Sequence, residues 1–234
     1  MILPSQYYEK NLYPLQDGVL NTLNQSGTDF FLTGGTALSR AYYNHRYSDD
    51  LDFFLNNSQT YDEQLDKIFA LLRENGFVWD IKNEFSRVKD FTTLKVKKDS
   101  DYSLKLDFVN DKVPLFGEIK KTDLFYRTDS IRNILSNKLS ALFRYAAKDI
   151  ADIWEIARHE KINWFLLINE TRQKEAGFEL IYASEILSGV PKSEFDSIDW
   201  IKKPDWEEFK NDIEMIIHEM TNIENLYAER KPKQ

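Results

Sequence analysis

The sequence predicts an α+β protein, with strands and helices in the first part of the chain and a helical region in the second. Short apolar runs of the kind that form strands occur before residue 111. Between them, and in much of the chain after residue 129, apolar residues recur at intervals of three and four, which is typical of amphipathic helices. With 234 residues, the chain is long enough for one large domain or two small ones.

Helix and strand signals alternate in the first part. Apolar positions at helical spacing predict helices over 6–25 and 61–75, and Gly76 is a natural end for the second of these. A shorter helix is expected over 37–44, directly after a glycine turn. Strands are expected over residues 30–32, 53–55, 77–81, 84–88, 91–97 and 102–110.

The second part is expected to be helical. Asp129 and Ser130 are suitable N-cap residues for a long helix that we predict to run to about residue 157. Further apolar patterns predict helices over 171–187 and 205–227. We therefore place a domain boundary between residues 128 and 129.

The composition excludes several kinds of site. The chain has no cysteine, so disulfides, thiolate zinc sites and a cysteine nucleophile are excluded, and three scattered histidines argue against a histidine-rich zinc site. No apolar run approaches the ~18 residues of a membrane span. The N-terminus lacks a basic stretch followed by an apolar one. We therefore expect no membrane partner, no signal peptide and a cytoplasmic location.

Charge is distributed unevenly along the chain. The net charge of −8 argues against a generally basic nucleic-acid binder. Residues 82–148 nevertheless carry 15 Lys and Arg against 9 Asp and Glu, whereas the rest carries 16 against 30. Such asymmetry can focus an anionic substrate into a cleft. A chance fluctuation among solvated lysines explains the pattern equally well.

Residues 30–55 combine a strand, a glycine turn, a helix and a second strand that follows an acidic pair. Residues two apart in a strand point to the same face, so Asp50 and Asp52 share one, and a divalent cation with oxygen ligands would relieve their repulsion. Gly34 and Gly35 let the backbone approach a ligand, and the next helix N-terminus offers N–H groups to an anion. The motif therefore suits an Mg²⁺–nucleotide. The alternative interpretation is a hairpin with solvated acids and an ordinary turn.

Further charged residues extend this hypothesis. Asp107 is expected on the polar face of strand 102–110, where a third carboxylate can bind a second ion or take the proton of an attacking hydroxyl. The alternative is plain solvent exposure. Lys138 falls inside the apolar stripe of the predicted long helix, and Asp149 and Asp152 continue the same line. Buried charges are costly unless they are paired or used. The alternative is a Lys138 that reaches out to solvent, with both aspartates paired to basic neighbours.

Two blocks of the sequence resemble the AbiEii/AbiGii-type nucleotidyltransferases, the toxin half of many abortive-infection and toxin–antitoxin pairs. The blocks, at roughly residues 30–55 and 131–154, are GGTALSR followed by RYSDDLDFF, and NKLSALFRYAAKDIADIW. The family has a Lys-x-x-Ala-Leu…Arg…Lys…Asp-x-x-Asp pattern in the second block, which here is Lys138, Ala141, Leu142, Arg144, Lys148, Asp149 and Asp152. Lys148-Asp149 stands where the family usually has Arg-Asp, and lysine supplies the charge without a bidentate fork.

The resemblance implies a polymerase-β-like nucleotidyltransferase core, a small mixed sheet flanked by helices, over residues 1–128. It implies a helical C-terminal domain over 129–234 that completes the active-site cleft. It also implies Asp50 and Asp52 as Mg²⁺ ligands, joined in our hypothesis by Asp107, and Lys138 as a triphosphate contact. The candidate nucleotide-binding residues are Gly34, Gly35, Thr36, Ser39, Ser48, Arg144, Lys148, Asp149 and Asp152.

The leading hypothesis is an Mg²⁺-dependent nucleotidyltransferase that moves a nucleoside monophosphate from a nucleoside triphosphate to an acceptor hydroxyl. The acceptor would be a tRNA-like RNA 3′ end or a protein, with the basic middle segment leaning to RNA, and the resemblance implies a cognate antitoxin as partner. Three alternatives stay open. They are a nucleotidyltransferase that modifies an antibiotic hydroxyl, a nucleotide- or partner-binding module without turnover, and a scaffold with solvated acids.

Overall fold

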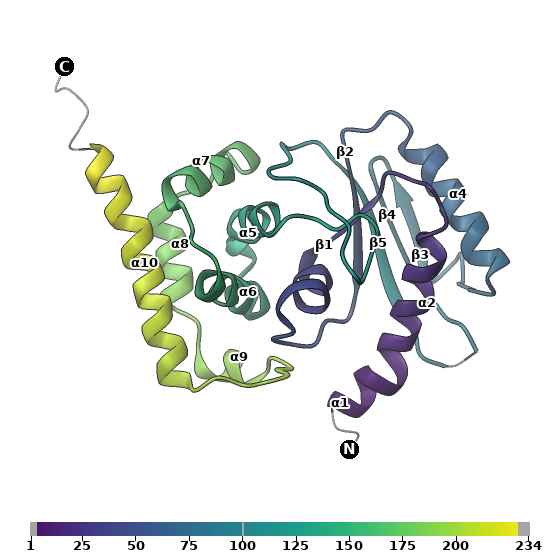
Figure 1. The fold of residues 1–234 in the computed structure, drawn as a ribbon, viewed down its shortest axis with the longest axis horizontal. Helices are drawn as coiled ribbons and strands as arrows, with labels where there is room; N and C mark the ends of the chain where they lie inside the picture. Colours follow the sequence, from purple (N-terminus) through teal and green to yellow (C-terminus); the bar gives the residue numbers. More distant parts are fainter. Residues whose placement is uncertain (1–3, 100, 229–234) are drawn as a thin grey trace. The chain divides into compact units, whose positions relative to one another are not determined.

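The computed structural model describes residues 4–99 and 101–228, which divide into two compact units, Met1–Ser130 and Ile131–Gln234. In its described part, the first unit contains one five-stranded sheet with helices, and the second contains helices (Figure 1). The predicted α+β class is confirmed.

The sheet of the first unit has the strand order β1-β2-β5-β4-β3. Neighbouring strands β2 and β5 are parallel, and the other pairs are antiparallel, so the sheet is mixed. The strands are β1 (Phe31–Thr33), β2 (Leu51–Asn56), β3 (Phe85–Val88), β4 (Phe91–Val96) and β5 (Leu104–Asp111).

The strand predicted over 77–81 is wrong. In that segment Val78 makes an isolated bridge to Lys97, and the chain then turns. The Asp80 carboxylate accepts hydrogen bonds from the Lys82 N–H at 2.8 Å and from Asn83 Nδ2 at 2.6 Å. Such local side-chain bonds offer the backbone an alternative to the sheet ladder.

One face of the sheet forms the apolar core of the first unit. Burial alternates along β2 and β5, and the fully buried positions are Leu51, Phe53, Leu55, Leu104, Leu106 and Phe108. Helix α4 (Tyr61–Glu74) covers this face: the Phe69 ring meets the Phe108 ring edge-on, and the Tyr61 hydroxyl donates to the Phe108 carbonyl at 3.0 Å. The opposite, half-exposed face of β2 and β5 therefore carries their charged side chains.

The remaining helices of the first unit follow the predicted pattern. The helix expected over 6–25 consists of α1 (Pro4–Tyr7), a wider turn η1 (Tyr8–Leu12) and α2 (Tyr13–Leu23). After β1, the chain enters α3 (Gly34–Thr36) and continues as η2 (Ala37–Tyr43), the helix expected over 37–44. Asn44 ends it in the left-handed conformation, with φ of 53°.

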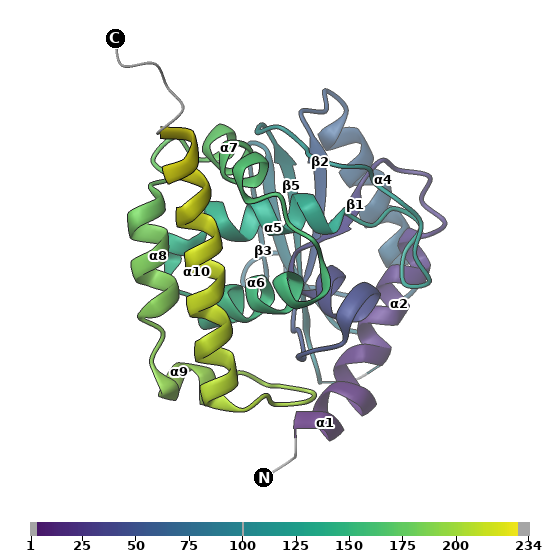
Figure 2. The same cartoon turned by 60° about the vertical axis from the view of Figure 1, so that its left-hand side comes forward.

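The second unit is built from helices α5 (Ile131–Ser140), α6 (Ala147–His159), α7 (Trp164–Lys174), α8 (Leu180–Ser188), α9 (Lys192–Asp196) and α10 (Trp206–Ala228), with a short turn η3 (Leu142–Arg144). Helix α5 packs against α6 and α7, and α10 runs alongside α8 (Figure 2). Within the described ranges, no helix has both the length and the apolar composition that crossing a bilayer requires.

Two predicted helices are each divided in the structure. The long helix expected from 131 to about 157 ends at Ser140, and Tyr145 takes the left-handed conformation with φ of 55° before α6 begins. The helix expected over 171–187 is interrupted by a turn in which the Phe178 N–H donates to the Glu175 carbonyl at 3.0 Å. In both places the helical spacing of apolar residues continues through the break, so periodicity alone does not reveal it.

Candidate active site

The half-exposed face of β2 and β5 brings three predicted site carboxylates together. Asp52 stands directly opposite Asp107 in the parallel β2–β5 ladder, so their side chains are neighbours on one face. Asp50 precedes β2 by one residue, and strand alternation places it on the same side as Asp52. The side chains of Asp50 and Asp107 are 44% and 14% exposed. Two adjacent strands thus supply three acids to one patch.

Lys105 belongs to the same patch. Its ammonium donates to Asp107 Oδ2 at 2.6 Å and lies 3.9 Å from Asp50 Oδ2. Burial lowers the pKa of Lys105, but the hydrogen bond to Asp107 and the charges of Asp107, Asp50 and Asp52 outweigh this, so its pKa is raised above the ordinary value. Sequence analysis did not single out Lys105, although its position two residues before Asp107 on one strand places both on the same face.

The chemistry of this patch fits a divalent cation. Asp107 Oδ1 is buried and accepts no hydrogen bond from the residues that the structure describes. Mg²⁺ takes oxygen ligands and is usually held by one or two carboxylates together with substrate phosphates, rather than by an all-protein cage. Among the described residues, no group of three or more acidic or histidine side chains is arranged so that it could hold a metal by itself. The patch could therefore offer a metal one or two carboxylates, and the remaining ligands would have to come from elsewhere.

The Gly34-Gly35 turn is required by the protein's own side chains. Gly34 has φ of 71°, and a Cβ built there would lie well under 3.0 Å from Asp52 Oδ2. A Cβ at Gly35 would meet the Arg46 guanidinium equally closely and would lie 3.1 Å from Ser48 Oγ. The turn thus packs directly against one carboxylate of the patch, and glycine is the residue that makes this approach possible.

Three hydroxyls that the resemblance placed at the nucleotide are buried in the first unit. The Thr36 hydroxyl is hydrogen-bonded to the Ser48 hydroxyl at 2.9 Å and to the Asp50 carbonyl. The Ser39 hydroxyl donates to the Arg46 carbonyl. These bonds fasten the loop before β2 onto α3 and η2. Thr36, Ser39 and Ser48 thus help to position the backbone before Asp50, and their role at a nucleotide stays a prediction.

The N-terminal helix fastens the same loop from another direction. Gln16 is fully buried, and its Nε2 donates to the Ser48 carbonyl at 2.9 Å and to the Asp49 carbonyl at 3.2 Å. Its Oε1 accepts from Arg40 Nη1 at 3.0 Å, and the Tyr8 hydroxyl donates to Asp49 Oδ1 at 2.5 Å. Sequence analysis missed these residues because a single glutamine in an amphipathic helix carries no local signal of its long-range partner.

In the second unit, Lys138, Asp149 and Asp152 form a buried ion cluster. The Lys138 ammonium lies 2.6 Å from Asp149 Oδ1 and 2.7 Å from Asp152 Oδ2, and the three side chains are 11%, 8% and 0% exposed. Arg144, which is largely exposed, adds a contact of 3.3 Å to Asp149 Oδ2. Lys138 does not reach out to solvent; it is itself the basic partner of the two aspartates.

The break between α5 and α6 makes this cluster possible. Lys138 and Asp149 are 11 residues apart. In one continuous helix they would be separated by ~16 Å along the axis. Because the chain turns back at Tyr145, α6 packs against α5 and the two charges meet.

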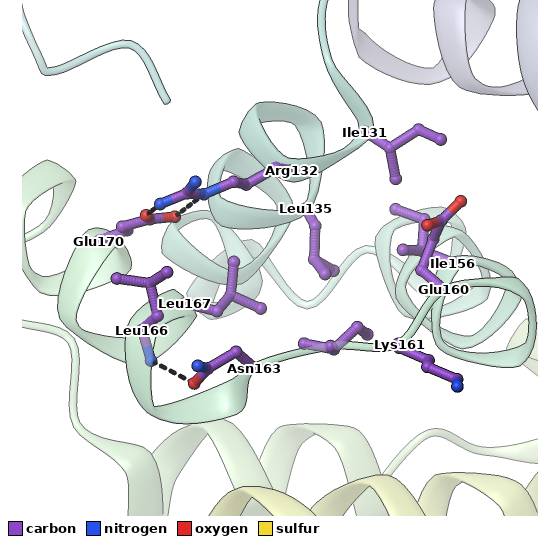
Figure 3. Close-up of a pocket in the computed structure, with 11 residues that line it drawn as sticks. Ile131, Arg132, Leu135, Ile156, Glu160, Lys161, Asn163, Leu166, Leu167 and Glu170 are labelled. Atoms are coloured by element: carbon purple, nitrogen blue, oxygen red, sulfur yellow. Dashed lines mark hydrogen bonds and ion pairs between the residues drawn. The ribbon is translucent and has the colours of Figure 1, made fainter. Parts of the chain in front are cut away.

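The second unit also contains a cavity of about 230 Å³ between α5, α7 and the end of α6 (Figure 3). Its apolar walls include Leu135, Ile156 and Leu167. At its edge Arg132 donates two hydrogen bonds to Glu170, whose carboxylate is 2% exposed. None of the predicted site residues lines this cavity.

Comparison with known proteins adds a family and a fold. A profile of the family described as "Nucleotidyl transferase AbiEii toxin, Type IV TA system" matches residues 19–227. JHP933 from Helicobacter pylori superimposes with a TM-score of 0.63 and 20% identity, over 98% of this chain and 100% of that chain. MenT4, a nucleotidyltransferase toxin from Mycobacterium tuberculosis H37Rv, superimposes with a TM-score of 0.63 and 16% sequence identity. This match covers 93% of this chain and 85% of the MenT4 chain. At such identities the likeness shows a shared fold. A search of the curated proteins finds no match.

Proposed function

The chain belongs to the family of AbiEii nucleotidyl transferase toxins of type IV toxin–antitoxin systems, and we propose that it transfers a nucleoside monophosphate from a nucleoside triphosphate to an acceptor hydroxyl with the help of Mg²⁺. The family and the enzyme class expected from the sequence are confirmed. The observation that carries the finer proposal is the pairing of Asp52 with Asp107 on adjacent parallel strands, with Asp50 beside them.

In this proposal the carboxylate patch is the catalytic centre. Asp50 and Asp52 would hold Mg²⁺, which when bound neutralises the charge that develops on the phosphate oxygens. The acceptor oxygen attacks the α-phosphorus, the bond from this phosphorus to the bridging oxygen breaks, and pyrophosphate leaves with the bonding electrons. Asp107 takes the proton of the acceptor hydroxyl. Its buried Oδ1, without a hydrogen-bond partner among the described residues, supports that role.

The nucleotide-binding residues are proposed from both units. The backbone of Gly34 and Gly35 lies against Asp52, so phosphates at this turn would be next to the carboxylate that we propose as an Mg²⁺ ligand. Lys138 is our proposed contact for the leaving pyrophosphate, with Arg144 and Lys148 as further cations. The hydrogen-bond distances of 2.6 and 2.7 Å support Asp149 and Asp152 as the residues that orient the Lys138 ammonium. Residues 1–128 would then be the catalytic core, and residues 129–234 the domain that carries Lys138, Arg144 and Lys148.

The acceptor and the biological partner follow from the family and from charge. The excess of Lys and Arg over residues 82–148 supports an RNA acceptor, such as a tRNA-like 3′ end, ahead of a protein hydroxyl. Membership of a type IV toxin–antitoxin family supports a cognate antitoxin as partner.

A labelling experiment tests this function. The protein is incubated with each of the four α-labelled nucleoside triphosphates and Mg²⁺, once with total RNA and once with RNA-free cell protein. We expect label in RNA, and we expect Asp50→Ala and Asp52→Ala to abolish it. Asp111→Ala is the matched control, because Asp111 lies four residues beyond Asp107 on the same face of β5. Unchanged labelling by Asp50→Ala and Asp52→Ala would refute the proposal, and nucleotide binding without transfer would leave only a binding module.

A further inference from the structure

Lys105 is placed among the proposed metal ligands but has no role in the reaction described above. Its ammonium lies 2.6 Å from Asp107 Oδ2 and 3.9 Å from Asp50 Oδ2. Because Leu51 pairs with Leu106 in the β2–β5 ladder, one further step of the register sets Asp50 opposite Lys105. A single ammonium thus bridges carboxylates that come from two strands.

A cation at this position has a clear electrostatic effect. Carboxylates gathered on one face repel each other, and a positive charge between them removes that cost. A divalent ion removes the same cost by binding the same oxygens. If it bound at Asp50 while Lys105 kept its place, 3.9 Å from Asp50 Oδ2, two cations would lie within a few ångströms of each other and would repel strongly. The ammonium and the metal are therefore alternatives.

The Lys105 side chain can leave the patch. It is 37% exposed, so part of its surface already faces solvent. Lysine carries a compact charge on a flexible stem of four carbons, which can turn outward without moving the strand. The backbone of Asp50 and Asp107, in contrast, is fixed by the strand register and by the bonds that hold the loop before β2.

We propose that Lys105 is a built-in counter-cation, which holds the Asp50 and Asp107 carboxylates in place before the metal arrives and is displaced when a divalent ion binds. The inference rests on the proposed function, because it takes these carboxylates as the metal site. Lys105 is then a positioning residue that competes with the metal for its ligands. Removing the ammonium should tighten metal binding, whereas loss of an ordinary structural contact would weaken it.

Metal titration without nucleotide tests the competition. Mn²⁺ binding is measured by calorimetry for the unchanged protein, Lys105→Gln and Lys95→Gln. Lys95 is the matched control, since it is exposed and stands directly opposite Lys105 on β4. Its substitution by glutamine removes the same charge from the same face. We expect Lys105→Gln to bind Mn²⁺ about tenfold more tightly or better, and Lys95→Gln to change the affinity by less than about twofold. Equal or weaker binding by folded Lys105→Gln would overturn the inference.

A second measurement uses the unchanged protein and does not depend on the folding of a variant. The lysines are acylated with and without Mg²⁺, and the modification of each is read by peptide mass spectrometry. Displacement predicts that Mg²⁺ raises the reactivity of Lys105 and leaves that of Lys95 unchanged. A Lys105 that is equally reactive in both conditions would overturn the inference.

The two proposals fail in different ways. If an Asp50→Asn, Asp52→Asn variant binds Mn²⁺ as tightly as the unchanged protein, these aspartates are not the metal ligands, and the proposed function is wrong. If that variant loses Mn²⁺ binding while Lys105→Gln gains none, the inference about Lys105 alone is wrong.

Discussion

Replacing Gly34 by alanine should damage the protein's stability and its reaction together. At φ of 71°, any residue with a Cβ is strained, which costs roughly 1–2 kcal/mol. The alanine also stiffens the unfolded chain and recovers about 0.4–1 kcal/mol of this. The added Cβ would meet the Asp52 carboxylate well under 3.0 Å, and overpacking of this kind costs about 1–3 kcal/mol more. The expected loss of unfolding free energy for Gly34→Ala is therefore about 1–5 kcal/mol.

Gly76→Ala separates the clash from the strain. Gly76 lies in the same unit with φ of 83°, and the nearest atom to an added Cβ is Lys98 Cε, at 3.8 Å. This variant should lose only the strain component less the same unfolded-state gain, about 0–1.6 kcal/mol.

Urea unfolding measures the loss of unfolding free energy for Gly34→Ala and Gly76→Ala. A nucleotide-transfer assay measures the loss of activity. Because displacing a catalytic group by ~1 Å costs on the order of 10² in rate, Gly34→Ala should transfer nucleotide about a hundredfold more slowly, and Gly76→Ala at the normal rate. Equal stability losses and equal rates for the two variants would refute the assigned packing of Gly34 against Asp52.

Three further predictions concern charges and a buried phenol. Lys138→Met should lower the unfolding free energy by ~3–5 kcal/mol, because it leaves two buried carboxylates without their basic partner. In urea unfolding, the double variant Lys138→Met, Asp152→Asn should recover part of this loss. If the losses of the two single variants simply add, the coupling between these charges is contradicted. Arg132→Met should lower the unfolding free energy by ~1–3 kcal/mol, because it removes the basic partner of the buried Glu170 carboxylate. Arg132→Lys should lower it less in urea unfolding, because it keeps the positive charge. Burial raises the pKa of Tyr13 from 10.0 to about 12, so the stability it contributes is complete below pH 10 and is lost as pH rises to about 12. Partial exposure of Tyr13 keeps this contribution to stability below ~2.7 kcal/mol. Between pH 9 and pH 12, the free energy of unfolding should therefore fall less for Tyr13→Phe than for the unchanged protein.

The half of the site that depends on strand alternation could be predicted from the sequence. Apolar residues at every second position define the buried face of β2 and β5, and the acids fall on the other face. The register that sets Asp52 opposite Asp107 could not be predicted, because it is fixed by a parallel pairing between strands about fifty residues apart. Strand alternation places Lys105 on the same face as Asp107, but its approach to Asp50 follows from that register and was missed.

The other parts of the site depend on tertiary contacts. The turn at Tyr145 interrupts a helical pattern that continues on both sides, and its reason lies in the packing of α6 on α5 and the charge cluster this forms. Likewise, the sequence did not indicate that the hydroxyls of Thr36 and Ser39 are hydrogen-bonded to backbone carbonyls of the next loop. Their proposed role at the nucleotide stays a prediction.

The most direct test of the central claim is the single-turnover rate of nucleotide transfer to RNA by Asp107→Asn. This change keeps the shape of the side chain and removes the carboxylate that we place beside Asp52 as proton acceptor. The account predicts a rate about 10²–10⁴-fold below that of the unchanged protein, with the nucleoside triphosphate still bound. Transfer at the normal rate would show that the reaction does not use the carboxylates that β2 and β5 bring together.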